Sequence, residues 1–498
     1  MADVLTALDA TFLELEQQND GALMSIGGVM VFDPLPGGGA PTVDQLAFEL
    51  GRRLGPLPRY SQRLSTPRTG GFSWPRWMDD DRFDIRNHIA HVALPAPGGA
   101  AELCDFSANF YSHRLDRGRP LWEVALIEGL EDGRWALAHK THHCLVDGVG
   151  SVSVAYLLLD AEPFPGERPE PPTRHGGQSV LSDLLENAPA PMVQAAQAGA
   201  RAAGAGLHAI RHPREALTRS RSLASLLMRD EVIGAPDSSI NVPIGSTRRF
   251  AVINVPLSEL KAIRRALGGS VNDVALAACT TGLRHLLISR GERPPGQGLR
   301  AMVPMNVRDT SEHLALGNRI SSLFVELPVG EPVADARHRQ IVEATARLKA
   351  SDAAIGATTM LDLAALAPPL LHAVLARSLY ANRLFNVTIT NVPGPQVPLY
   401  SFGAKLREIH PVVPLAADHS VGIAIFSYDG LVTFGVIADS ESTPDIAELA
   451  FGIEQGLEEL RALASGAQDE AASGLSPLVE IDVSGSRDRA QISGAAGA

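Results

Sequence analysis

The chain has 498 residues, of which 45% are hydrophobic and 20% charged, the composition of a globular protein too long for one ordinary core. Its formal net charge of −13 argues against nucleic acid as a partner, because no basic stripe dominates. Its three cysteines, Cys104, Cys144 and Cys279, form neither a disulfide framework nor a zinc pattern. We therefore expect two globular domains in a reducing cytoplasm, without a metal site.

No segment of the sequence is expected to cross a membrane. The N-terminal segment lacks the basic region and the continuous apolar run of a signal peptide. No run of about 18 apolar residues occurs, and the most apolar stretch, 363–376, is interrupted by Pro368 and Pro369. The protein can still lie on a lipid surface without crossing it.

Residues 1–165 alternate between strand and helix patterns, which predicts a mixed α/β domain. Strands are expected within 22–33, 83–98, 121–130 and 134–141. Helices are expected at 43–54, after a Pro/Gly-rich turn, and at 100–116. The last two strands should form a hairpin, because turn residues separate them at Glu131, Asp132 and Gly133.

The heptapeptide HHCLVDG, from His142 to Gly148, carries the clearest chemical signal. It follows the expected strand at 134–141 and precedes apolar residues at helical spacing, so it should form a strand-to-helix loop that can mount reactive side chains. Adjacent histidines are common by chance, but an aspartate and a glycine at fixed later positions make the match specific.

A histidine in this loop is a candidate general base. A neutral imidazole can take the proton of a hydroxyl while that hydroxyl attacks a carbonyl carbon. Asp147 can fix the loop or the tautomer of a histidine ring, and Gly148 permits a tight turn. The alternative is structural, with two core histidines, one of them bonded to Asp147.

The composition changes abruptly after the first domain. Residues 161–178 are proline-rich and predict an extended linker. Residues 190–232 are rich in alanine and carry six arginines among spaced leucines. This pattern suits either an amphipathic helix on anionic lipid or a solvated connecting helix packed on the body. We assign residues 166–245 to this linker and helical connector.

Residues 246–465 predict a second α/β domain, and the small polar residues at 466–498 predict a disordered tail. Strands are expected at 249–258, 299–308, 319–329 and 384–395. Helices are expected at 258–267, 270–290, 333–350, 357–381 and 443–464. The segment 419–439 predicts a hairpin that turns at Tyr428, Asp429 and Gly430.

Two short motifs lie near expected element starts. Pro120, Leu121 and Trp122 precede a strand, which alone suggests a strand opened by proline and an aromatic core residue. Asn272 and Asp273 lie in the first turn of an expected helix, where polar or acidic side chains are favourable. Helix capping explains Asp273 better than it explains Asn272.

A third group of candidates lies in the expected strand at 384–395. Thr388, Thr390 and Asn391 lie at its end, where a hydrogen-bond donor can stabilise negative charge on a reacting carbonyl oxygen. The Pro/Gly-rich turn alone accounts for the residues that follow. We therefore keep these three side chains as candidate oxyanion donors.

The motifs occur in the same order in the bacterial wax ester synthase/diacylglycerol acyltransferase family, which the sequence resembles from its N-terminus to about residue 450. HHCLVDG matches the HHxxxDG signature of the wider CoA-dependent acyltransferase superfamily, which includes chloramphenicol acetyltransferase and peptide-synthetase condensation domains. Three short motifs, PLW, ND and TNVPGP, resemble motifs of the narrower family, although Thr390 stands where serine is usual. A fourth stretch, MVPMNVR at 302–308, also resembles the family, with Asn306 in place of the usual serine. The resemblance implies an α/β fold of the α+β type. Two chloramphenicol-acetyltransferase-like domains with mixed sheets would be joined by a long linker, with an active-site tunnel between them.

The resemblance also implies roles for the candidate residues. His143 would be the general base midway along the tunnel, while His142 and Asp147 would hold the loop. The PLW motif at 120–122 would lie near the alcohol-binding pocket, and the ND motif at 272–273 would face the catalytic channel. No metal and no bound cofactor are implied.

The reaction implied by the resemblance is O-acyl transfer from acyl-CoA, the co-substrate, to diacylglycerol or a long-chain fatty alcohol. The acceptor oxygen would attack the thioester directly, without an acyl-enzyme. An oily product would favour peripheral association with the inner membrane or with lipid inclusions. The sequence leaves the preferred acceptor, the acyl chain length and the oligomeric state open.

Three other functions stay open from the sequence. The first is a stand-alone condensation-type acyltransferase that uses carrier-protein thioesters, although no adenylation or carrier segment is present. The second is metal-assisted hydrolysis with His142, His143 and Asp147 as ligands, which adjacent histidines on an extended chain disfavour. The third is a non-catalytic protein that binds lipid or coats droplets.

Overall fold

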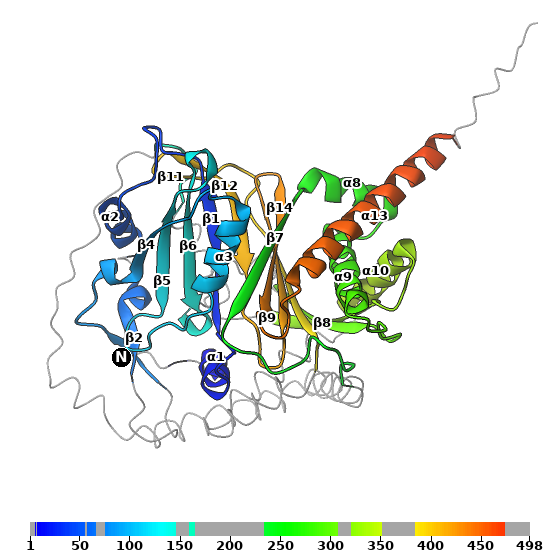
Figure 1. The fold of residues 1–498 in the computed structure, drawn as a ribbon, viewed down its shortest axis with the longest axis horizontal. Coiled ribbons are helices and arrows are strands. Elements are labelled where there is room, and N and C mark those ends of the chain that lie inside the picture. The colour runs from blue at the N-terminus through cyan, green and yellow to red at the C-terminus, as the bar shows by residue number, and fades with distance from the viewer. Residues whose placement is uncertain are drawn as a thin grey trace, which may run out of the picture.

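The computed structural model describes residues 5, 7–54, 57–65, 75–145, 159–164, 234–306, 320–350 and 384–473. Within these residues the chain forms two six-stranded sheets that lie side by side (Figure 1). The first sheet has the order β11-β12-β1-β6-β5-β4, and the second has the order β7-β14-β13-β10-β8-β9. The predicted α/β architecture with two sheet-containing domains is therefore confirmed.

The N-terminal half supplies most of the first sheet, through β1 (Ser25–Phe32), β4 (Ile89–Ala93), β5 (Trp122–Glu128) and β6 (Trp135–His142). This half also contains α1 (Ala7–Gln18), α2 (Val43–Leu54), α3 (Ala100–Phe110) and a small hairpin of β2 (Gln62–Leu64) and β3 (Trp77–Asp79). Strand β6 lies between β1 and β5 and is antiparallel to both. Its successive side chains point to opposite faces, so Leu137 joins the cluster that includes α2 and Ala138 joins the cluster that includes α3.

The first sheet also contains strands from much later in the chain, β11 (Tyr400–Ser401) and β12 (Ala404–Val412). Strand β12 pairs antiparallel with β1, from Gly27 opposite Val412 to Phe32 opposite Leu406. This pairing corrects the predicted boundary, which placed all of 246–465 in the second domain. Local periodicity can indicate that a segment is a strand, but it does not identify a partner strand in another sheet.

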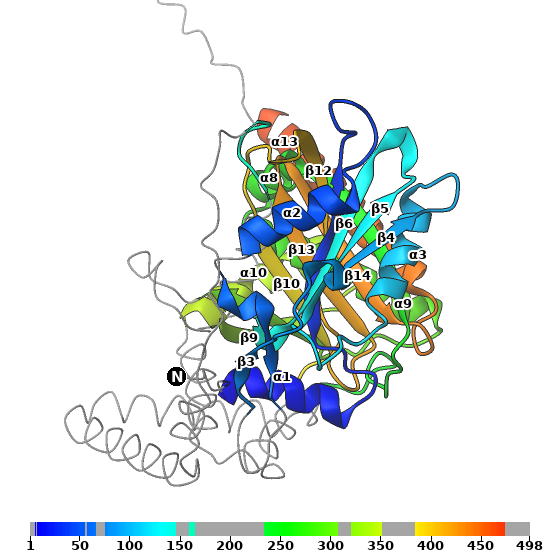
Figure 2. The same ribbon diagram turned by 90° about the vertical axis from the view of Figure 1, so that its left-hand side faces the viewer.

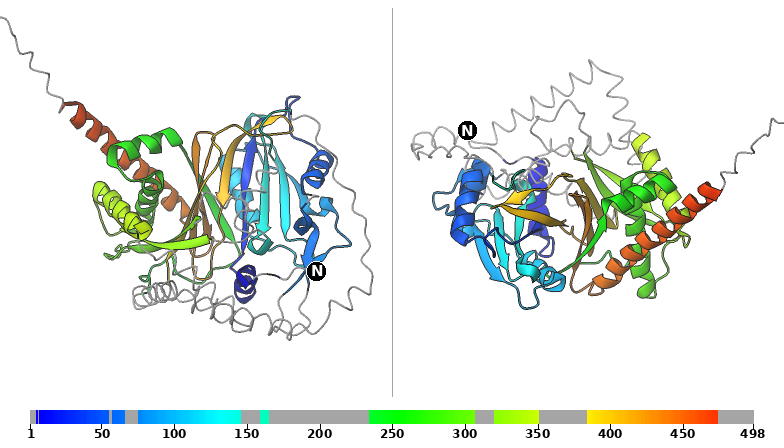
Figure 3. Two further views of the ribbon diagram at one scale, coloured as in Figure 1. Left: turned by 180° about the vertical axis from the view of Figure 1, so that it is seen from behind. Right: turned by 90° about the horizontal axis from the view of Figure 1, so that it is seen from above.

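The second sheet is mixed. Its strands are β7 (Arg248–Pro256), β8 (Leu299–Asn306), β9 (Ile320–Leu327), β10 (Val387–Pro393), β13 (Val421–Tyr428) and β14 (Leu431–Asp439). Strand β10 is parallel to β8 and β13, whereas the other pairs are antiparallel. The outer side of this sheet carries α8 (Leu257–Leu267), α9 (Val271–Ser289), α10 (Ala334–Ala350) and α13 (Ile446–Ser473), as Figures 1 and 3 show.

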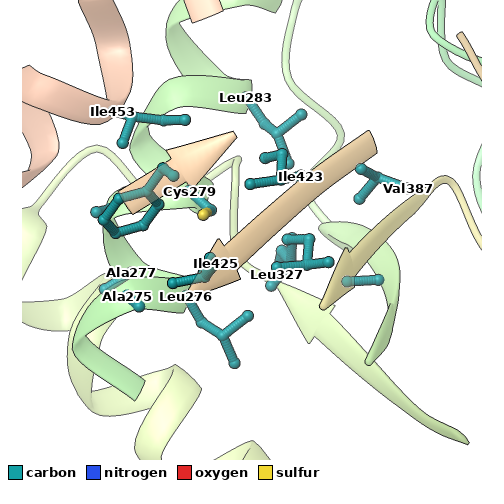
Figure 4. Close-up of a cluster of buried hydrophobic side chains, with 14 of the residues drawn as sticks. Ala275, Leu276, Ala277, Cys279, Leu283, Leu327, Val387, Ile423, Ile425 and Ile453 are labelled. Carbon is teal, nitrogen blue, oxygen red and sulfur yellow. The ribbon is translucent and has the colours of Figure 1, made fainter. Parts of the chain in front are cut away.

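Helix α9 forms the centre of the second core. Its apolar stripe is buried against the sheet, with Cys279 and Leu283 close to Ile423 of β13 (Figure 4). Each large apolar side chain buried in this way contributes roughly 1.5–3 kcal/mol. Gly282 lets α13 approach closely, because a Cβ there would lie 2.5 Å from Ile453 Cγ1.

The two sheets meet through α3, β7 and β12. An apolar cluster at this junction contains Tyr111, Phe250 and Val412. Polar bonds accompany it: the Arg248 backbone N–H donates to Ser112 Oγ at 2.8 Å, and the side chain of Asn254 donates to a Glu408 carboxylate oxygen at 2.8 Å. Elements from both halves of the chain therefore share one interface.

Several predicted elements agree with the structure, including the helix at 43–54 and the hairpin at 419–439. The last helix continues to Ser473, so residues 466–473 are helical and the predicted start of the disordered tail was wrong. A helix can continue beyond its buried stripe, because its backbone hydrogen bonds join residues that are close in the sequence. The predicted helix at 357–381, most of the linker and the remaining tail lie outside the described residues.

Candidate active site

The two histidines of HHCLVDG lie where the central strand of the first sheet ends. His142 is the last residue of β6, and its N–H donates to the Leu121 carbonyl at 2.9 Å. His143 begins a 3₁₀ turn, and its N–H donates to the Met24 carbonyl at 2.8 Å. The strand-to-loop transition thus occurs at the predicted position, and neighbouring strand ends fix both backbones.

The His142 ring is held on both sides and is almost fully buried. Its Nδ1 accepts the Cys144 N–H at 3.1 Å, so the ring proton of the neutral form lies on Nε2. That Nε2 lies 3.6 Å from Oε2 of Glu16 on helix α1. The hydrogen bond from the Cys144 N–H fixes the tautomer, and the nearby Glu16 charge attracts the Nε2 proton without a hydrogen bond, as expected for a supporting residue.

Glu16 is a buried carboxylate with three polar neighbours. Oε2 accepts from Arg117 at 2.7 Å and faces His142, while Oε1 accepts the Met24 N–H at 3.3 Å. Burial raises the pKa of Glu16, but hydrogen bonds and charge from His142 and Arg117 outweigh it and lower the pKa to about 2. Glu16 therefore stays ionised and links α1 to the segment that begins at His142 and His143, which we call the histidine loop.

His143 packs against the aromatic ring of Phe12, also on α1. The two rings stack with centroids 3.7 Å apart and an interplanar angle of 16°. Burial, with a smaller effect of His142, lowers the pKa of His143 to about 4. Its buried Nδ1 has no hydrogen-bond partner in the described part of the chain. At neutral pH the imidazole is uncharged and can accept a proton, which is the state that a general base requires.

Sequence reasoning missed the contribution of α1. Phe12 and Glu16 are four residues apart and therefore share one helix face, which in this structure contacts His143 and His142. Figure 2 shows α1 at the lower edge of the described fold. The available signal was an acidic residue on the apolar face of an amphipathic helix. Asp147 and Gly148, by contrast, lie outside the described residues, and their roles stay predictions.

The PLW motif is part of the core beside the histidines. Pro120, Leu121 and Trp122 are all buried, and the Leu121 carbonyl holds His142. The Trp122 ring stacks on His88 at 4.5 Å, and its Nε1 donates to the Tyr60 carbonyl at 2.8 Å. These contacts match the structural alternative of an aromatic core residue that supports the end of β6.

The ND motif divides into two different roles. Asp273 caps α9 through Ser270 and also accepts from Thr345 Oγ1 at 2.9 Å, so its carboxylate is occupied by structural bonds. Asn272 Oδ1 accepts from Asn391 Nδ2 at 2.9 Å. The structure thus brings together two candidate residues that lie more than a hundred positions apart in the sequence.

The candidate oxyanion donors on β10 do not share one face. Side chains alternate along a strand, so Asn391 lies on the same side as Ile389, which is buried in the α9 core. Thr388 and Thr390 therefore point to the opposite side, away from α9. Any donor function on that side belongs to the two threonines, while Asn391 links β10 to Asn272.

Within the described part of the chain, no helix combines the length and the hydropathy that crossing a bilayer requires. No group of three or more His, Cys, Asp or Glu side chains there is arranged to hold a metal ion.

Comparison with known proteins gives the family. The model of the wax ester synthase/diacylglycerol acyltransferase catalytic domain matches residues 5–275, and the model of the WS/DGAT C-terminal domain matches residues 316–461. The chain belongs to this family. A probable diacylglycerol O-acyltransferase of Mycobacterium tuberculosis, tgs1, is 34% identical over 92% of this chain and 96% of its own length. A second one, tgs2, is 30% identical over 92% of this chain and 98% of its own length.

Solved structures of this fold are consistent with the family assignment. The wax ester synthase/diacylglycerol acyltransferase from Marinobacter aquaeolei VT8 superposes with a TM-score of 0.65 at 29% identity, covering 93% of this chain and all of that one. The starter condensation domain of rhizomide synthetase superposes with a TM-score of 0.56 at 15% identity, covering 94% of this chain and 95% of that one. The second likeness concerns the fold alone.

Proposed function

We propose that this protein transfers a long-chain acyl group from acyl-CoA to the hydroxyl of diacylglycerol or a long-chain fatty alcohol, with His143 as general base. The observation that carries the proposal is the position of His143, which directly follows β6, stacks on Phe12 and lies next to a fixed His142. Its lowered pKa keeps the ring neutral at neutral pH. The family relationship supports the choice of acyl donor and acceptors.

The mechanism requires only proton transfer and positioning from the protein. His143 takes the proton of the acceptor hydroxyl as its oxygen attacks the thioester carbonyl carbon. The C–S bond then breaks, and the imidazolium returns the proton to the departing CoA sulfur. Stacking on Phe12 shields one face of the ring from water, which limits hydrolysis of the thioester.

An acyl-enzyme intermediate is not part of the proposal. Cys144 is the thiol next to His143, yet its side chain is buried and its N–H is bonded to His142. Burial, followed by the charge of Asp9, raises the pKa of the Cys144 thiol well above its usual value. A thiol that stays protonated is a poor nucleophile, which favours direct attack by the acceptor.

The acceptors and products are insoluble in water, so we also propose that the protein works at the surface of a membrane or lipid inclusion. Flotation with vesicles that contain diacylglycerol tests this part. Co-migration of protein with the vesicles is expected, and protein that stays in the dense fraction at every lipid composition would contradict it.

The reaction is tested by CoA release from palmitoyl-CoA with hexadecanol, with dipalmitoylglycerol, or without acceptor. Release that requires an acceptor is expected, and the better acceptor identifies the preferred reaction. Equal release with and without acceptor would indicate a thioesterase. No release with either lipid, together with turnover of carrier-protein thioesters, would favour a condensation-type acyltransferase.

A further inference from the structure

A polar groove of about 500 Å³ lies where α3 of the first domain faces β7 of the second. The first domain lines it with Asn109, Ser112 and His113, and the second domain lines it with Ser246, Thr247 and Arg249. It is separate from the histidine loop, and its volume falls in the range of small-molecule sites.

The lining of this groove suits an anion. The chain as a whole carries a net charge of −13, yet Asp105 is the one carboxylate among the lining residues. Arg249 is exposed, and no ion pair to it occurs in the described part of the chain, whereas the neighbouring Arg248 is turned inward onto the Gly21 and Gly245 carbonyls. A solvent-exposed guanidinium, together with nearby hydroxyl, amide and imidazole groups, can bind a phosphate group.

Two contacts connect the lining of the groove to residues near the histidine loop. The Lys140 ammonium donates to the His113 carbonyl at 3.0 Å, and Lys140 lies three residues before His143, about 10 Å along the chain. Arg248 bonds the Gly21 carbonyl, in the short loop that leads to Met24, whose carbonyl holds the His143 N–H. The groove therefore adjoins the part of the first domain that holds His143.

We propose that the groove between α3 and β7 binds the phosphate-bearing nucleotide end of acyl-CoA, with Arg249 as the principal cation. This inference rests on the proposed function, because it takes acyl-CoA as the donor. CoA carries its thioester sulfur and its 3′-phosphate at opposite ends, so one molecule can occupy both places. The groove would then set the affinity for the donor without taking part in the chemistry.

Kinetics with two donors test the assignment. Palmitoyl-CoA and palmitoyl-3′-dephospho-CoA are compared in the wild type, in Arg249→Glu and in Arg264→Glu, which reverses another exposed arginine on α8 outside the groove. Arg249→Glu is expected to raise KM for palmitoyl-CoA roughly tenfold at low salt with unchanged kcat. It should change KM for the dephospho donor much less, and Arg264→Glu should change neither. Equal changes for both donors, or no change, would overturn the proposal.

Calorimetric titration with CoA and with 3′-dephospho-CoA separates this inference from the proposed function, because it needs no turnover. Weaker binding of CoA by Arg249→Glu, with equal binding of dephospho-CoA, supports the groove even if no lipid acceptor is used. Unaltered CoA binding refutes the groove even if acyl transfer is established. Arg249→Gln provides the same comparison with a smaller perturbation of the fold.

Discussion

The buried Glu16 should contribute strongly to stability and to the geometry of the histidine loop. Glu16→Gln keeps the shape of the side chain but removes the charge that faces Arg117 and His142. A fall of the folded-state pKa from 4.5 to about 2 corresponds to roughly 3 kcal/mol of stabilisation at neutral pH. We therefore expect the variant to be less stable by about that amount at pH 7.

The sign of the pH dependence follows from the lowered pKa. The stabilisation is complete above the unfolded pKa of 4.5 and is lost as pH falls through the folded pKa of about 2. The stability difference between the wild type and Glu16→Gln should therefore shrink to about half near pH 3. Glu14→Gln, on the same helix but in an exposed hydrogen bond, is the matched control and should change stability by less than about 0.5 kcal/mol.

Urea denaturation at both pH values, followed by circular dichroism, measures these differences. Acyl transfer measured in parallel should show a lower kcat for Glu16→Gln, because the His142 ring loses its carboxylate partner. A stability loss below about 1 kcal/mol at pH 7, or a loss that does not depend on pH, would contradict this role of the Glu16 charge.

Three other substitutions test separate parts of the structure. Phe12→Leu removes the stacked ring and should raise the pKa of His143 from about 4 toward its ordinary value. Since the neutral imidazole is the active form, the acid limb of kcat/KM should move to higher pH, and an unchanged pH profile would contradict this. Trp122→Phe removes the hydrogen bond from Nε1 to the Tyr60 carbonyl and should lower the free energy of unfolding, measured by thermal denaturation, by about 1 kcal/mol. A raised KM for the acceptor would instead indicate that Trp122 lies near the alcohol-binding pocket. Gly21→Ala places a Cβ 2.1 Å from the Ile244 carbonyl oxygen and should lower the unfolding temperature, and an unchanged temperature would show that this loop shifts freely.

Local sequence patterns predicted the elements that build the site but not the contacts between them. The end of β6 at His142 and the helix at 43–54 follow from alternation, helical periodicity and turn residues. The N-terminal capping role of Asp273 also follows, because Ser270 and Asp273 have the spacing of a capping box. Each of these features depends on residues that are close together in the sequence.

The features that escaped prediction depend on distant parts of the chain. Strand β12 joins the first sheet although it lies among residues of the second domain, and β1 gives no local sign of that partner. Glu16 faces His142 across more than a hundred residues, and Asn272 meets Asn391 across a similar separation. Trp122 was assigned two alternative roles because its burial and its bond to Tyr60 depend on tertiary packing.

In the proposed reaction His143 is the base that activates the acceptor hydroxyl. The most direct test is the rate of ester formation from palmitoyl-CoA and the better lipid acceptor, measured by mass spectrometry for the wild type and His143→Ala. His91→Ala, which removes an exposed histidine on β4, serves as the control. We predict that His143→Ala lowers kcat by roughly a hundredfold or more while its fold and its CoA binding persist. Ester formation by folded His143→Ala within tenfold of the wild type would contradict the account.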